Sequence, residues 1–151
     1  MATHDLSIAH LEQHMEAFRR LIELGFSQGD VSMVDEIFAP DFVEHQAGVV
    51  PPNREGVKGL VAYLHQAMPD LSIVVADIAA YQDKVWARLI GRGTHNGPFM
   101  GVPPTGRAIT VEIIDICRFK GGKIVEHWGY TDRLAALEQL GAAAQESWPR
   151  A

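Results

Sequence analysis

The stretch VEIIDICRF-KGGK-IVEHWGYTD, residues 111–132, decides the fold. Two runs rich in β-branched and aromatic residues flank the pair Gly121-Gly122, which is the pattern of a β-hairpin. Side chains alternate between the two faces of a strand, so Asp115 lies in the middle of an apolar face of the first run. Burying a carboxylate alone is costly, and we therefore expect Asp115 to have a partner or a shifted pKa.

The partner of Asp115 depends on the turn, and the residues allow two registers. A two-residue type I′ turn places Asp115 opposite Trp128. A three-residue loop with a G1 bulge at Gly122 places Asp115 opposite His127. We favour the second register because it gives the buried carboxylate a hydrogen-bonding partner. It also groups apolar and aromatic residues on the opposite face, which would suit a subunit interface: Ile114, Ile116, Trp128 and Tyr130.

Outward from the hairpin, the spacing of apolar residues changes near residue 70. Helical spacing predicts three helices before that point, and alternation predicts strands after it. The helices are expected at 5–27, 31–38 and 54–68, the strands at 41–46, 71–78, 85–95, 108–119 and 124–132, and a last helix after Asp132. Pro40 should close the second helix, and Asn53 should cap the third. This order predicts an α+β fold, a cone of helices packed on a curved antiparallel sheet, with a cavity between the two layers.

The length and composition of the chain favour one small domain, 1–151, with a core of about 5–141 and a loose C-terminal tail, 142–151. A net charge of −6 argues against a nucleic-acid partner. The single cysteine, Cys117, cannot form an intrachain disulfide, which favours a cytoplasmic location. We see no signal peptide in residues 1–5 and no apolar run near the roughly 20 residues that a membrane span needs. The seven histidines are scattered, and neither a metal site nor a cofactor is expected.

Two segments carry a resemblance to a known family. GTHNGPFMGVPPTGR, residues 93–107, and GKIVEHW, residues 122–128, resemble the SnoaL-like polyketide cyclases of the NTF2-like superfamily. The similarity runs from about Phe18 to Gly141 and implies an NTF2-like fold, a homodimer or homotetramer, and a pocket for a hydrophobic small molecule. The family's cyclases close a ring by a cofactor-free intramolecular aldol reaction, with an aspartate as acid/base aided by a histidine. That aspartate falls at Gly129 and that histidine at Asp115, so the sequence departs from the pattern at both positions.

We expect Asp115 and His127 to form the catalytic pair, with Asp115 as general base or acid and His127 as its partner or proton relay. The substrate would be a hydrophobic, carbonyl-containing and polyketide-like molecule, and the reaction a cyclisation, an isomerisation or a related lyase step. The candidate substrate-binding residues are His45, Tyr63, His95, Phe99 and Met100. Each has a plainer interpretation: a solvated strand end for His45, a loop anchor for His95, and ordinary packing for the other three.

Two other functions stay open on the sequence. A non-catalytic module could bind a small molecule with the same fold, and the glycine at position 129 favours it. An epoxide-hydrolase-like enzyme would need an arginine between two aspartates, which Arg88 or Arg92 could supply if its side chain points inward.

Overall fold

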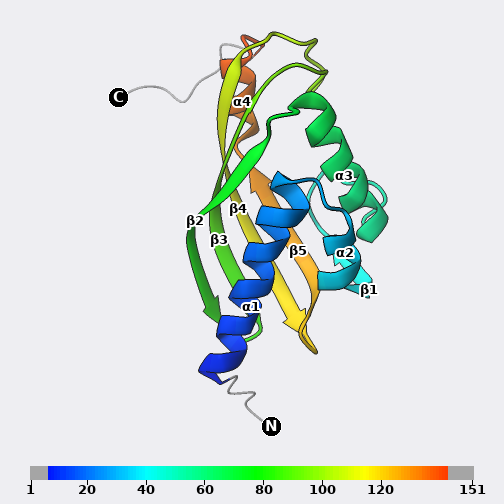
Figure 1. Cartoon of the computed structure of the whole chain (residues 1–151), viewed down its shortest axis with the longest axis vertical. Coiled ribbons are helices and arrows are strands. Elements are labelled where there is room, and N and C mark those ends of the chain that lie inside the picture. The colour runs from blue at the N-terminus through cyan, green and yellow to red at the C-terminus, as the bar shows by residue number, and fades with distance from the viewer. Residues whose placement is uncertain (1–6, 143–151) are drawn as a thin grey trace.

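Five strands form one curved sheet, and helices cover one of its faces (Figure 1). This computed structural model describes residues 7–142. The expected helix start at residue 5 and the expected tail beyond residue 142 lie outside the described residues. The strands lie in the order β1-β5-β4-β3-β2. Their bounds are β1 Phe38–Glu44, β2 Ser72–Tyr81, β3 Lys84–Thr94, β4 Ala108–Lys120 and β5 Lys123–Thr131.

The helices begin and end close to the expected positions. Their bounds are α1 Ile8–Arg20, α2 Ser32–Ile37, α3 Arg54–Ala67 and α4 Arg133–Gln139, and a π-helical segment, Leu21–Ser27, continues α1. The side chain of Asn53 accepts hydrogen bonds from the backbone N–H groups of Glu55 and Gly56, so the predicted cap of α3 is confirmed. Asp132 caps α4 in the same way, by accepting from Ala135 N–H at 3.0 Å. None of these helices is both long enough and apolar enough to cross a membrane.

The predicted α+β fold is confirmed, but one pair of strands runs parallel rather than antiparallel. β1 lies at the edge of the sheet and pairs parallel with β5. The second helix ends at Ile37, and Pro40, which was expected to close it, lies inside β1. An edge strand accepts proline because one side of its backbone has no ladder partner. The early start and parallel direction of β1 bring Glu44 into register with His127 of β5.

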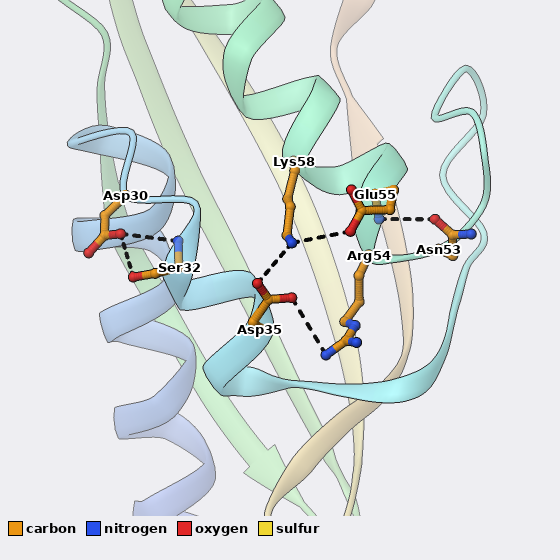
Figure 2. A network of polar contacts seen from close by, with 7 residues as sticks. All are labelled: Asp30, Ser32, Asp35, Asn53, Arg54, Glu55 and Lys58. Atoms are coloured by element: carbon orange, nitrogen blue, oxygen red, sulfur yellow. Dashed lines mark hydrogen bonds and ion pairs between the residues drawn. The ribbon is translucent and has the colours of Figure 1, made fainter.

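Polar contacts join α2 to α3 (Figure 2). Asp35 of α2 contacts Lys58 Nζ at 2.8 Å and Arg54 Nη1 at 3.6 Å, and both cations belong to α3. The pKa of the Asp35 carboxyl is lowered, chiefly by its hydrogen bond to Lys58. These pairs are partly exposed, so we expect them to orient the two helices rather than to add much stability.

The β4–β5 hairpin adopts neither of the two registers that the sequence offered. Gly121 and Gly122 both have positive φ, 59° and 76°, as a two-residue type I′ turn requires. Phe119 therefore faces Ile124, but a bulge follows at once, because Arg118 faces Glu126 and Val125 has no partner. The extra residue shifts every later pair by one, so Asp115 lies opposite Gly129.

The bulge preserves which side chains share a face. Asp115, His127 and Gly129 lie on the inner face of the sheet, as the favoured register had predicted for Asp115 and His127. His127 is a diagonal neighbour of Asp115 rather than its direct partner. Ile114, Ile116, Trp128 and Tyr130 share the outer face, which the helices do not cover.

Candidate functional site

A cavity of about 700 Å³ lies between the inner face of the sheet and the helices. Its wall is largely apolar, and a few polar groups are placed among the apolar side chains, as in most small-molecule sites. Helix α1 and the π-helical segment contribute Phe18, Leu21, Ile22 and Phe26, and the sheet contributes Ile73, Leu89, Val111 and Ile113. A planar, mostly apolar molecule would find few polar groups to contact except at one wall.

That wall carries a carboxylate–imidazole–carboxylate cluster of Glu44, His127 and Asp115. His127 Nδ1 lies 2.8 Å and 2.9 Å from the two carboxylate oxygens of Glu44. His127 Nε2 lies 3.2 Å from Asp115 Oδ1. All three residues are buried and line the cavity. Asp115 also lines the cavity, so its carboxylate stands between the imidazole ring and a molecule bound there.

The two carboxylates hold His127 in its charged form. Burial by itself would lower the pKa of His127, but the attraction and hydrogen bond of Asp115, and then those of Glu44, outweigh burial and raise it to about 10. At neutral pH the ring therefore carries a proton on each nitrogen and donates to one carboxylate from each side. His127 is an imidazolium that orients Asp115, and it is not the base of the pair.

The cluster is not arranged as a metal site. The two carboxylates contact opposite nitrogens of one ring, so their oxygens cannot converge on one ion together with a ring nitrogen. Across residues 7–142, no three histidine, cysteine, aspartate or glutamate side chains are grouped to hold a metal.

A second polar group lies beside the cluster, next to Gly129. A Cβ placed on Gly129 would lie 2.2 Å from Gln46 Oε1 and 2.8 Å from His127 Cε1. The Gln46 side chain thus occupies the space that a side chain at position 129 would take. Gln46 is half-buried and lines the cavity, and its backbone N–H donates to Glu44 Oε1 at 2.8 Å.

Three of the predicted substrate-binding residues line the same cavity. Tyr63 projects from α3, and its hydroxyl accepts a hydrogen bond from Met100 N–H at 2.8 Å. Phe99 is buried and lies against Tyr63, with ring centroids 5.9 Å apart. Met100 has a positive φ of 52°, which is uncommon for a residue with a side chain. Together these residues close one side of the cavity.

The other two predicted residues lie away from the cavity lining. The His45 ring stacks on Trp128 at 4.8 Å and lies 3.6 Å from Glu126. His95 is fully buried, and its Nδ1 contacts Thr105 Oγ1 at 2.9 Å across the base of the loop that carries Phe99. The geometry of His95 is that of a loop anchor.

The arginines considered for epoxide hydrolysis are not at the cavity wall. Arg88 contacts Asp77 at 2.6 Å and Glu112 at 3.0 Å on the outer face of the sheet. Arg92 is exposed and lies four positions after Arg88 on β3, so its side chain is on the same outer face. The inward arginine that this reaction would need is absent from the cluster, where His127 stands between two carboxylates.

Glu44 and Gln46 were missed by the sequence reasoning, although a signal for both was present. Phe42 is a core residue, and side chains two and four positions along an extended chain repeat the same direction. Alternation from Phe42 would have placed Glu44 and Gln46 on the inner side. A glutamate in that position needs a buried partner, as Asp115 does.

Known proteins resemble the chain over most of its length. The family model described as SnoaL-like polyketide cyclase matches residues 14–140. Aklanonic acid methyl ester cyclase DauD from Streptomyces sp. (strain C5) is 29% identical over 92% of this chain and 86% of its own length. Nogalonic acid methyl ester cyclase from Streptomyces nogalater is 30% identical over 82% of this chain and 92% of its own. The structure of TsrD from Streptomyces laurentii superposes with a TM-score of 0.79 at 30% identity, over 91% of this chain and 99% of that one.

Proposed function

The chain belongs to the SnoaL-like polyketide cyclases, and on that premise we propose that it closes a ring in a polyketide-like molecule by a cofactor-free aldol reaction, with Asp115 as the acid/base group. The observation that carries the proposal is the buried cluster at the wall of the cavity, in which His127 lies against Asp115 and the Asp115 carboxylate lines the cavity. An apolar cavity of this volume suits a fused aromatic or partly cyclised carbon skeleton.

The position of Asp115 supports this assignment. The resemblance implies an acid/base aspartate at position 129, where this chain has glycine. Asp115 and Gly129 are direct cross-strand partners, and such partners have Cβ atoms about 4.5–5.5 Å apart. The carboxylate therefore reaches the same part of the cavity from the neighbouring strand, β4 instead of β5.

The reaction needs one base and no cofactor. Asp115 Oδ2 takes a proton from a carbon flanked by two carbonyl groups, and the resulting enolate carbon attacks a ketone of the same molecule. A carbon–carbon bond forms while the ketone π bond breaks, and the new oxyanion takes the proton back from Asp115. The product is an isomer of the substrate. His127 and Glu44 are positioning residues, because they fix the direction of the carboxylate and stabilise its charge through the imidazolium.

Substitution of Asp115 tests the proposal. Aklanonic acid methyl ester and nogalonic acid methyl ester are suitable trial substrates, because relatives are named for them. Asp115→Asn should lower turnover by roughly 10²–10⁴-fold, the usual contribution of general acid–base catalysis. The matched control is Asp41→Asn, an exposed aspartate on β1, which should retain full activity. Equal turnover in Asp115→Asn and wild type would contradict the mechanism, and a wild type that binds these molecules unchanged would favour a non-catalytic binding module.

We also propose that the enzyme is a homodimer that pairs through the outer face of its sheet. Trp86, Ile114 and Tyr130 are 48%, 42% and 65% exposed on that face, and exposed apolar side chains that gather on one face often mark an interaction site. The charges around it are already paired within the chain, Arg88 with Asp77 and Glu112, so a second copy would meet no strong repulsion. The variant Trp86→Lys should convert a dimer to a monomer in light scattering. A wild type that is monomeric at high concentration would contradict this proposal.

The cytoplasm is the location we propose for the protein. Cys117 is free and fully buried, and a buried thiol needs no oxidising compartment. Cell fractionation of a tagged chain would test this, and recovery outside the cytoplasmic fraction would contradict it.

A further inference from the structure

The Gln46 amide lies at the reaction centre without a partner in the described part of the chain. Its backbone N–H bonds Glu44, which fixes the residue against the cluster, but its side chain makes no hydrogen bond with residues 7–142. Its Oε1 and His127 Cε1 both lie within 3 Å of the point where a Gly129 side chain would begin. A half-buried amide with free hydrogen-bonding groups in an apolar cavity is suited to a ligand.

The charge on His127 sets the direction of this amide. The amide oxygen is the end nearer position 129, where the ring carbon between the two protonated nitrogens of His127 also lies. That edge of an imidazolium is positive, so it attracts the oxygen and repels the NH₂ group. The NH₂ group is therefore the end left to donate to a molecule in the cavity.

We propose that Gln46 Nε2 donates a hydrogen bond to the substrate oxygen that becomes negative when Asp115 removes the proton. This inference rests on the proposed function and names its substrate class: an enolisable 1,3-dicarbonyl compound, such as a β-keto ester. In such a compound the acidic carbon and the carbonyl oxygen are two bonds apart. Asp115 would contact the carbon while Gln46, which adjoins the same cross-strand pair, contacts the oxygen.

Gly129 is part of this arrangement. A Cβ at position 129 would collide with the end of the Gln46 side chain and also with His127 Cε1. Gly129→Ala should therefore displace both the amide and the ring that positions Asp115. It should lower turnover at least as much as deletion of the amide.

Three variants test the donor by kinetics on aklanonic acid methyl ester. Gln46→Leu keeps the volume and removes the donor, and it should lower kcat by roughly 10²–10³-fold, as for loss of an oxyanion donor. Gly129→Ala should lower kcat at least as much, and adding Gln46→Leu to it should cost less than Gln46→Leu costs alone, because the amide is already displaced. Gln66→Leu, at an exposed position of α3, is the matched control and should behave as wild type. A Gln46→Leu enzyme within twofold of wild-type kcat would overturn the inference.

A binding measurement decides the point independently of turnover. 2-Naphthol is a planar probe whose hydroxyl oxygen resembles an enolate oxygen, and its Kd can be measured by fluorescence for wild type, Gln46→Leu and Asp115→Asn. Loss of the donor should weaken binding by roughly 3–10-fold, because the neutral hydroxyl of 2-naphthol makes an ordinary neutral hydrogen bond with the amide. An unchanged Kd in Gln46→Leu, or no binding of the probe to wild type at its solubility limit, would overturn the inference. If instead Asp115→Asn keeps full turnover, the proposed function fails while the Gln46 result still stands on the binding data.

Discussion

The buried histidine makes a quantitative prediction about stability and pH. His127 keeps its proton to about pH 10 in the folded protein, whereas a histidine in the unfolded chain loses it near 6.5. A pKa that is raised on folding contributes stability that is fully present below the unfolded value and is lost as the pH rises through the folded value. The free energy of unfolding should therefore fall steadily above pH 6.5.

The size of the effect follows from the shift in pKa. Each pKa unit corresponds to about 1.4 kcal/mol, so the whole contribution of His127 is on the order of 5 kcal/mol. Between pH 7 and pH 9 the free energy of unfolding should fall by roughly 2–3 kcal/mol. This is a large fraction of the stability of a small domain, which is typically about 5–15 kcal/mol. Urea unfolding followed by circular dichroism, at one protein concentration and several pH values, would measure it.

The control is a double variant, Glu44→Gln with Asp115→Asn, in which both carboxylates become amides of the same shape. Without them, His127 has no reason to hold its proton above neutral pH, and the slope between pH 7 and pH 9 should disappear. Burial first, and then the charges of Asp115 and Glu44, raise the pKa of Cys117, so this thiol adds a slope near pH 9. Burial is the same in both proteins, so most of this slope cancels in the comparison. Equal slopes in wild type and double variant would refute the account of the cluster.

Three further predictions concern the supports of the cavity. Gly59→Ala in α3 should stabilise the protein by about 0.5–1 kcal/mol, because the new methyl group meets nothing within 4 Å. Gly56→Ala in the same helix should destabilise it, because its methyl group would lie 1.8 Å from a backbone oxygen. The midpoints of urea unfolding compare the two variants. Asn53→Ala removes the cap of α3 and should cost about 1 kcal/mol in the same assay, and no change would contradict the cap. Thr105→Val removes the hydroxyl bonded to His95 and should speed proteolysis of the loop 96–106 without a large change in global stability, and an unaltered cleavage rate would show that the loop is held by other contacts.

Local chemistry made most of the fold predictable. Helical spacing, the cap at Asn53 and the turn signals between strands depend on neighbouring residues, so one sequence reveals them. The register of the last hairpin did not follow, because a bulge at Val125 leaves no clear mark in side-chain type. The faces were still assigned correctly, since the bulge adds one residue and so restores the alternation of the favoured register.

The candidate site was predictable in part. A carboxylate at position 115 on an apolar strand face predicts a buried partner, and His127 was found because it lies on the adjoining strand. Alternation from Phe42 indicates the inner side for Glu44, but the contact of Glu44 with His127 depends on the parallel pairing of β1 with β5, which joins distant segments and which no local pattern encodes. The role of Gln46 depends on the space left at Gly129, which only three-dimensional coordinates reveal.

The parallel pairing of β1 with β5 also affects how the chain folds. Glu44 and His127 are 83 positions apart, so the cluster closes only after the last strand has been synthesised and has docked against the first. Such long-range closure is entropically slow. An incomplete chain would bury a carboxylate with no counter-ion, a state that is strongly disfavoured. The three side chains of the proposed active site therefore make the native state depend on the docking of β1 against β5. Contacts between neighbouring residues alone cannot form the cluster.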